Sequence, residues 1–190
     1  MDLVLDNPAI PEIPKDQVLE WLKERRKYLE GVAITGGEPL LSENLPEFMR
    51  EVKALGFSIK LDTNGYRPER LALTMKEGLI DYVAMDIKTS REKYEQATGK
   101  PVDFDVIDKS ITLITGSAKD YEFRTTVVPG LVEIDDVEKI ARWVGGAKRY
   151  RLQQFKPTTT LDPAYQNVSP HPREVLEKMK AVAQQHVKDV

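Results

Sequence analysis

The sequence has no cysteine among its 190 residues and only two histidines. The lack of cysteine excludes disulfides, a thiolate nucleophile and thiolate-bound metal within this chain. His171 lies in a proline-rich loop and His186 near the end of the last predicted helix. We therefore expect both histidines to be exposed, and neither to replace a cysteine as a metal ligand.

The sequence also lacks long apolar runs, a signal-peptide pattern and a strong charge of either sign. No apolar stretch approaches the length of a membrane span. The net charge of -3 and the pI near 5.6 give no general attraction to nucleic acid or to an anionic membrane. We therefore predict a soluble cytoplasmic protein, folded as a single domain over residues 1–190, with no nucleic-acid or membrane partner.

Short apolar runs alternate with amphipathic stretches along almost the whole chain. Strands are predicted around residues 32–35, 58–65 (a strand that ends in a turn), 82–88, 121–130 and 150–155. Helical spacing follows in the segments between them, and the final helix is predicted from about Arg173 to His186. About five strands that alternate with helices predict an α/β fold, with a parallel sheet and the helices outside it. The long loop 157–172 follows the last strand, and it either covers a site or is a plain surface connection.

The predicted strands carry charge, although strands of parallel sheets are usually apolar on both faces. Side chains alternate along a strand, so one face is apolar and the other polar. The predicted polar face holds Lys60, Asp62 and Asn64, then Asp86 and Lys88, then Glu122, Arg124 and Thr126, and finally Gln153 or Gln154. These side chains either pair with one another as a buried network or bind a polar ligand of both charge signs. Because ligands of β/α folds bind at the carboxyl ends of strands, we favour the ligand.

The stretch GVAITGGEPLL ends the first of these strands in two glycines and a carboxylate. Gly36 and Gly37 let the backbone approach a ligand closely and leave its amides or carbonyls free to bind it. Glu38 adds a carboxylate at the same rim, which suits an ammonium group. An ordinary strand-to-helix turn is the alternative for this stretch alone.

Five motifs, in order, resemble the radical S-adenosylmethionine superfamily, and most closely the activating enzymes of glycyl radical enzymes. They are GVAITGGEPLL, KLDTNGYRPERL, DYVAMDIKTSREKYEQATG, RTTVVPG and GAKRYRLQQFKP. The resemblance covers nearly the whole chain and is closest to the anaerobic ribonucleoside-triphosphate reductase and pyruvate formate-lyase activating types. It implies a partial (β/α) barrel with parallel strands.

The resemblance implies two cofactors, S-adenosylmethionine and a 4Fe-4S cluster. In that family the cluster cleaves S-adenosylmethionine to a 5′-deoxyadenosyl radical, which removes a hydrogen from a glycine of the partner enzyme. By motif match the resemblance assigns the S-adenosylmethionine site to nine residues. They are Gly36, Gly37, Glu38, Asp62, Asn64, Asp86, Lys88, Arg124 and, by a loose match, Gln154.

The family's cluster-binding CxxxCxxC segment is absent from this chain. In relatives it directly precedes the stretch that matches DLVLDNPAI, so the family's first strand is expected to be missing too. A late start codon, a truncation and a degenerate paralogue each explain the absence, and we favour a truncated or mis-started chain. We expect no radical activity from these 190 residues, and no catalytic or metal-binding residue among them.

The resemblance also implies partners, and three functions compete. The first is the larger part of an activase, with a glycyl radical enzyme such as anaerobic ribonucleotide reductase as partner and flavodoxin or ferredoxin as electron donor. The second is a non-catalytic module that binds S-adenosylmethionine or a partner. The third is an enzyme similar to 7-carboxy-7-deazaguanine synthase. A missing first strand would leave the edge beside Val32–Thr35 unpaired, which predicts a homodimer through that edge.

Overall fold

A curved sheet of five parallel strands organises the protein. The computed structural model describes residues 11–158, 160 and 162–190. The strands lie in chain order and are all parallel. They are β1 Gly31–Ile34, β2 Ser58–Thr63, β3 Tyr82–Asp86, β4 Tyr121–Val127 and β5 Tyr150–Gln154. The α/β fold with a parallel sheet is therefore confirmed.

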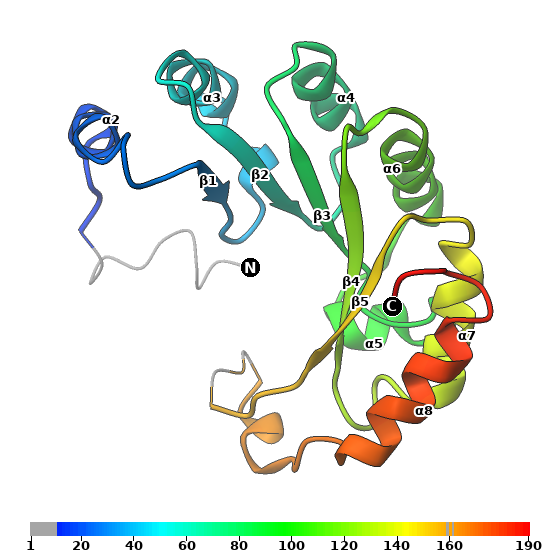
Figure 1. Ribbon diagram of the computed structural model, residues 1–190. Coiled ribbons are helices and arrows are strands. Elements are labelled where there is room, and N and C mark those ends of the chain that lie inside the picture. The colour runs from blue at the N-terminus through cyan, green and yellow to red at the C-terminus, as the bar shows by residue number, and fades with distance from the viewer. Residues whose placement is uncertain (1–10, 159, 161) are drawn as a thin grey trace.

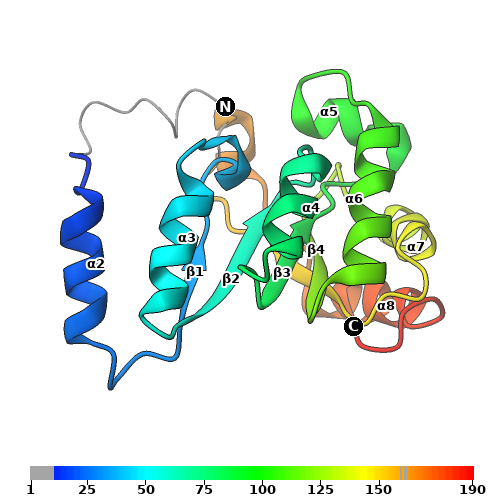
Figure 2. The same ribbon diagram turned by 90° about the horizontal axis from the view of Figure 1, so that it is seen from above.

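The helices lie in an arc outside the curved sheet (Figure 1). The α-helices are α2 Lys15–Glu24, α3 Leu45–Ala54, α4 Pro68–Lys76, α5 Tyr94–Thr98, α6 Phe104–Ser117, α7 Ile134–Trp143 and α8 Arg173–Ala183. Seen from above, α2, α3, α4 and α6 stand side by side along one face of the sheet (Figure 2). Strands inside and helices outside form an incomplete β/α barrel, which confirms the predicted architecture. No helix of the described residues is long and apolar enough to cross a membrane.

Local sequence explains where these helices form. In α3 the buried residues Leu45, Met49 and Val52 recur at helical spacing and face the sheet. Pro68 occupies the first turn of α4, where its missing N–H costs no hydrogen bond. The last helix ends earlier than the predicted His186, because the chain then turns to place Asp189 beside Arg149 in a parallel bridge.

The two faces of the sheet differ as the alternation predicts. On the convex face, Ile59, Leu61, Val83, Met85 and Phe123 are almost fully buried beneath the helices. On the concave face the strands present charged or polar side chains that are only partly buried. Burial of the convex side chains is the main source of stability, at about 1.5–3 kcal/mol for each large apolar side chain. The concave face remains free to carry polar groups.

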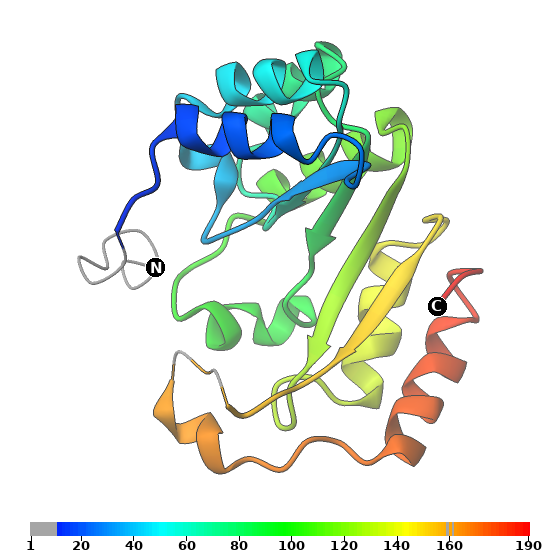
Figure 3. The same cartoon turned by 60° about the vertical axis from the view of Figure 1, so that its left-hand side comes forward.

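The strands all point toward the end of the sheet where two further segments lie. Figure 3 shows α5 and the loop that contains the 3-10 helix η3 (Pro163–Asn167) at this end. Within the described residues β1 and β5 are the edge strands. The amide of Tyr150 donates to the carbonyl of Asp189 at 2.9 Å, so the C-terminal segment covers the start of the β5 edge. The carboxyl ends of the strands, where ligands of β/α folds bind, are thus lined by loops.

A substitution of Gly65 tests how tightly the turn after β2 packs on the core. Its φ is +76°, and an added Cβ would lie 2.1 Å from the Cε atom of the buried Met85. We expect Gly65→Ala to lower the free energy of unfolding by about 2–4 kcal/mol, through backbone strain and overpacking. The measurement is urea denaturation followed by circular dichroism.

Gly116→Ala in α6 is the matched control, because an added Cβ there meets no atom within 4 Å. Alanine in a helix should raise the free energy of unfolding by about 0.5–1 kcal/mol. Equal denaturation midpoints for the two variants would contradict the packing described for the β2 turn.

Candidate functional site

Arg124 joins the polar ends of three neighbouring strands. From β4 its Nε atom donates to Asp86 Oδ1 on β3 at 2.9 Å, and its Nη1 atom lies 3.2 Å from Asp62 Oδ1 on β2. Parallel register places Asp86 beside Arg124, so the pair follows directly from the sheet. Burial disfavours the charged guanidinium, but the carboxylates of Asp86 and Asp62 outweigh burial and raise the pKa of Arg124 above its ordinary value.

Further charges extend this network in both directions. Lys88 Nζ donates to Asp86 Oδ2 at 2.9 Å near the strand ends. Deeper in the concave face, Lys60 Nζ lies 3.4 Å from Glu122 Oε1, and Lys60 also lies 3.7 Å from Asp62. The concave network, defined as Lys60, Asp62, Asp86, Lys88, Glu122 and Arg124, thus holds three acids and three bases, a net charge of zero.

One atom of the network has an unused hydrogen-bonding capacity. Asp62 Oδ1 is buried, and within the described part of the chain no donor reaches it in hydrogen-bonding geometry, although Arg124 lies close enough for an ion pair. A buried acceptor without a donor is costly unless something else supplies one. This oxygen is therefore a candidate acceptor for a ligand hydroxyl or ammonium.

The backbone of Gly36 and Gly37 lies free at the end of β1. Gly36 has φ +148°, a conformation that favours glycine, and an added Cβ would meet nothing within 4 Å. Among the described residues, neither glycine has a backbone hydrogen bond outside the strands. Both amides and both carbonyls are thus candidate partners for a ligand, and their contact with one stays a prediction.

Glu38 is turned inward, which differs from the rim position expected from the sequence. Its side chain is 3% exposed. Its Oε1 accepts from Thr63 Oγ1 at 2.9 Å and from the Leu40 amide at 3.2 Å, and Oε2 accepts from the Asn64 amide at 2.7 Å. Glu38 therefore ties the turn after β1 to the end of β2, a structural role that sequence reasoning missed. The proposed contact with an ammonium group remains a prediction.

Asn64 has its own local role in the turn after β2. Its Oδ1 accepts from the amide of Tyr66 at 2.9 Å, which forms an Asx turn. Thr63 was not among the predicted site residues, yet its hydroxyl accepts from the Gly65 amide at 3.1 Å while donating to Glu38. A threonine directly before an Asn-Gly turn is the sequence signal that could have identified it.

Tyr94 supports Lys88 from α5, and no sequence signal distinguished it from an ordinary core residue. Its hydroxyl accepts from the Lys88 amide at 3.3 Å. Burial raises the pKa of Tyr94 to about 12, so the phenol stays protonated at neutral pH. The side chain of Lys88 is 45% exposed, which leaves its ammonium accessible from the concave side.

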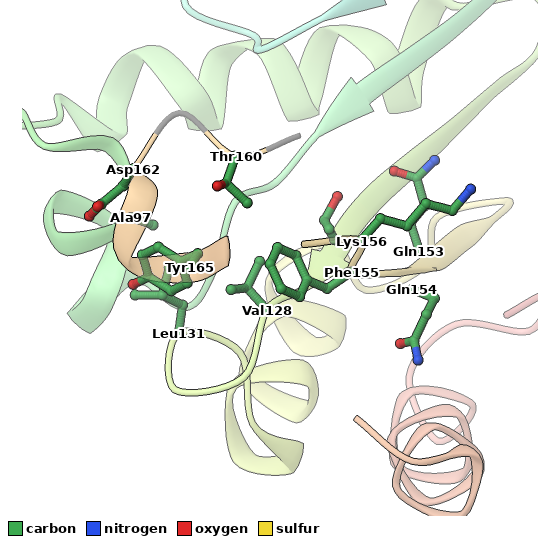
Figure 4. A pocket seen from close by; sticks show the side chains of 11 residues that line it. Ala97, Val128, Leu131, Gln153, Gln154, Phe155, Lys156, Thr160, Asp162 and Tyr165 are labelled. Carbon is green, nitrogen blue, oxygen red and sulfur yellow. The ribbon is translucent and has the colours of Figure 1, made fainter. Parts of the chain in front are cut away.

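An open recess lies beside the network, at the ends of β4 and β5. Its volume is about 730 Å³, and Figure 4 shows its walls. Val128, Leu131, Phe155 and Tyr165 form the apolar part, with the rings of Phe155 and Tyr165 edge to face at 6.5 Å. Thr126, which also lines the recess, is two residues beyond Arg124 on the same face of β4. The recess and the network are therefore about 7 Å apart along the strand.

The structure contradicts the expected exposure of the two histidines and gives the two glutamines of the last strand opposite orientations. A ligand contact of Gln154, which also lines the recess, stays a prediction. Register pairs Gln153 with Thr126 on the concave face, whereas Gln154 points away from it, and its Nε2 donates to the His171 carbonyl at 2.8 Å. Figure 4 shows the two glutamines pointing in opposite directions. His171 is only 9% exposed, and its Nε2 atom lies 3.0 Å from the carbonyl of Val132. His186 is half-buried and lies 3.4 Å from Arg142.

No group of three or more potential metal ligands gathers anywhere in residues 11–158, 160 and 162–190. The structure places seven predicted residues at or just beyond the carboxyl ends of β1 to β3, namely Gly36, Gly37, Glu38, Asp62, Asn64, Asp86 and Lys88. Arg124 lies in the middle of β4, in register with Asp86 at the end of β3. The residue that it does not bring to them is Gln154. The stretch DLVLDNPAI, residues 2–10, lies outside the described residues.

Burial of Glu38 predicts a pH dependence of stability. Burial, only partly offset by the Asn64, Thr63 and Leu40 donors, raises the pKa of Glu38 above its ordinary value of 4.5. The folded state then holds a proton that the unfolded state has lost, so this contribution to stability falls as pH rises from 4.5 through the folded pKa. We expect wild type to lose stability relative to Glu38→Gln across that window. Urea denaturation of both proteins from pH 4 to pH 8 measures it.

In the Glu38→Gln variant an NH₂ group replaces one of the two oxygens that accept hydrogen bonds. We therefore expect the variant to be less stable than wild type at every pH in that range. A stability difference that stays constant with pH, or that grows in favour of wild type as pH rises, would contradict the assigned pKa direction.

Comparisons of the sequence with known proteins identify the family. The Radical SAM superfamily model matches residues 5–144. A "Putative glycyl-radical enzyme activating enzyme" of Methanocaldococcus jannaschii is 34% identical over 169 residues, which cover 86% of this chain and 70% of that protein. A "Probable GTP 3′,8-cyclase" of Pyrococcus abyssi is 30% identical over 124 residues, 63% of this chain and 39% of that protein.

Solved structures show the same fold. A domain of pyruvate-formate lyase-activating enzyme from Bacteroides vulgatus matches with a TM-score of 0.64 and 20% identity, over 82% of this chain and 93% of that one. An archaeal TYW1 matches with a TM-score of 0.63 and 14% identity, over 96% of this chain and 66% of that one. A second "Putative glycyl-radical enzyme activating enzyme" of M. jannaschii is 28% identical over 135 residues, which cover 68% of this chain and 51% of that protein. On the family match over most of its length, the chain belongs to the radical S-adenosylmethionine superfamily.

Proposed function

We propose that the concave face binds S-adenosylmethionine at the carboxyl ends of β1 to β4, and that the chain is the larger part of a glycyl radical enzyme activating enzyme. One observation carries the binding proposal. A charge-balanced network, partly open to solvent, lies beside a glycine pair whose backbone is free.

The amino-acid end of S-adenosylmethionine fits this face. Its ammonium needs acceptors, which the Gly36 and Gly37 carbonyls and a carboxylate of the network supply. Its carboxylate needs cations, which Lys88 and Arg124 supply. Because the network is neutral, the ammonium and carboxylate of this end, which balance each other, can enter it without adding net charge, and the carboxylates of the network also suit the positive sulfonium.

The nucleoside end fits the remaining features. The free acceptor of Asp62 and the carboxylate of Asp86 suit ribose hydroxyls. The recess beyond Thr126 has an apolar, aromatic lining, which suits a flat heteroaromatic ring. When bound, S-adenosylmethionine is the family's source of the radical, and the residues above would bind and orient it.

The 4Fe-4S cluster does not fit the residues present. The 190 residues contain no cysteine, and the described residues contain no cluster of other ligands. The chain's own residues therefore provide binding and orientation but no electron transfer, and no step through the cluster is assigned to them.

The ion pairs of the concave network would also exist if its role were purely structural. Two features favour the ligand. The side chains of Lys88 and Asp86 are 45% and 28% exposed, more than a buried structural network requires. In addition, Gly36 and Gly37 directly follow β1, the strand next to that of Asp62, and no described residue hydrogen-bonds their backbone.

The activase proposal is supported by the extent of the similarity to the archaeal activating-enzyme relative, which exceeds that to the GTP cyclases. The activase proposal includes a glycyl radical enzyme as partner, with anaerobic ribonucleotide reductase as the candidate. It also includes flavodoxin or ferredoxin as electron donor, in an anaerobic cytoplasm. The outer edge of β1, which pairs with no other strand among the described residues, is the surface proposed for a homodimer. A non-catalytic binding module and a 7-carboxy-7-deazaguanine synthase-like enzyme remain the alternatives.

Replacing Asp86 and Lys88, the ion pair at the carboxyl end of β3, tests the binding site. We expect wild type to bind S-adenosylhomocysteine, a stable analogue, and Asp86→Ala with Lys88→Ala to weaken binding by at least about a hundredfold, since two charge-assisted contacts are lost. The measurement is isothermal titration calorimetry.

The matched control also replaces one aspartate and one lysine by alanine, but on the convex side. Asp105→Ala with Lys109→Ala alters two exposed residues of α6 and should leave affinity within about twofold of wild type. Equal affinities for the two double variants would sink the site assignment.

The missing cluster ligands predict binding without turnover. After anaerobic reconstitution with iron and sulfide and addition of dithionite, the 190-residue chain should form no 5′-deoxyadenosine from S-adenosylmethionine. Liquid chromatography of the quenched reaction detects that product. Its formation above the protein-free control would show that this chain ligates a cluster by groups other than cysteine.

A further inference from the structure

The loop between β5 and α8 returns to the point where it leaves the sheet. Gln154, the last residue of β5, donates from Nε2 to the carbonyl of His171 at 2.8 Å, 17 residues further along the chain. A compact loop whose ends meet in this way is an Ω-loop. One side chain of the sheet thus closes the loop at its base.

The His171 side chain makes a second connection from the same position. Its Nε2 atom lies 3.0 Å from the carbonyl of Val132. Because a carbonyl can only accept, Nε2 carries the proton and donates. Glu133, whose carboxylate lies 3.8 Å from Nε2, is the neighbouring charge. His171 therefore ties the base of the loop to the segment that precedes α7.

These two bonds set the wall of the recess. Tyr165 lies in the middle of the loop, and its ring meets that of Phe155 edge to face. Leu131, which also lines the recess, directly precedes the residue whose carbonyl His171 binds. Fixing His171 to Val132 thus fixes the loop that carries Tyr165 relative to Leu131 (Figure 4).

We infer that Gln154 and His171 are positioning residues, which hold the loop so that Tyr165 and Phe155 form the aromatic recess for the nucleoside ring of the ligand. This inference rests on the proposed S-adenosylmethionine site. It gives Gln154 an indirect role in place of the direct contact expected from the sequence, since its side chain acts through the loop from the face opposite the network.

The first test examines the loop without ligand. Gln154→Met removes the donor at similar length, and amide hydrogen exchange of peptides within residues 162–170 should become about three- to tenfold faster. Exchange in α3 and α6 and the melting temperature should stay near wild type. Gln166→Met, an exposed glutamine in the same loop, is the matched control and should exchange as wild type does.

The second test examines the recess with two partial ligands, 5′-methylthioadenosine and methionine, by ligand-observed NMR. Gln154→Met should weaken binding of the nucleoside about three- to tenfold and change methionine affinity by less than about twofold. A general loss of stability would weaken both probes. His171→Gln, whose amide can donate to Val132, should keep nucleoside affinity, and His171→Phe should lose it as Gln154→Met does.

Unchanged loop exchange in Gln154→Met would overturn the positioning role. Faster exchange with unchanged nucleoside affinity would overturn the link between this loop and the recess. If wild type binds methionine and S-adenosylhomocysteine but not 5′-methylthioadenosine, the recess assignment fails while the proposed function stands. If wild type binds none of the three, the proposed function itself fails.

Discussion

The guanidinium of Arg124, held between Asp62 and Asp86, is the interaction on which the concave side of this protein depends. Parallel strands in register place their side chains at the same level, so charges on three adjacent strands lie within a few ångströms of one another. Two carboxylates at that distance would repel one another, and a cation between them turns repulsion into attraction. The sheet can therefore carry charge where most parallel sheets carry apolar side chains.

A polar concave face has consequences for the whole architecture. The apolar core must lie entirely on the convex side, beneath the helices, and it does so from Ile59 on β2 to Tyr150 on β5. The concave side then needs no apolar filling and can stay accessible at the strand ends. Gly36 and Gly37 at the end of β1 and the recess beyond β4 border this surface. Stability and ligand binding are in this way assigned to opposite faces of the same sheet.

The strand pattern and its two faces could be predicted from the sequence because they depend on local alternation. The runs KLDTN, VAMDIK and EFRTTV each alternate polar with apolar residues, so the face of Asp62, Asp86 and Arg124 follows without knowledge of the tertiary structure. The positions of Gly36 and Gly37 follow in the same way from the end of an apolar run.

The remaining details depend on contacts that local pattern does not contain. In the last strand Gln153 and Gln154 are chemically identical, and a register difference of one residue exchanges their faces. Glu38 turns inward because the Thr63 hydroxyl and the Asn64 amide at the end of β2 supply donors, and His171 is buried where a carbonyl before α7 lies within reach. Each is set by residues more than 20 positions away, which no short motif reveals.

The most direct test of the account is a crystal structure of this chain with S-adenosylhomocysteine. The account predicts the ligand across the ends of β1 to β4, with its ammonium at the Gly36–Gly37 backbone, its carboxylate at Lys88 or Arg124, and its base in the recess beside Phe155. A ligand bound elsewhere, with Arg124 still held between Asp62 and Asp86 and Asp62 Oδ1 still without a donor, would contradict it.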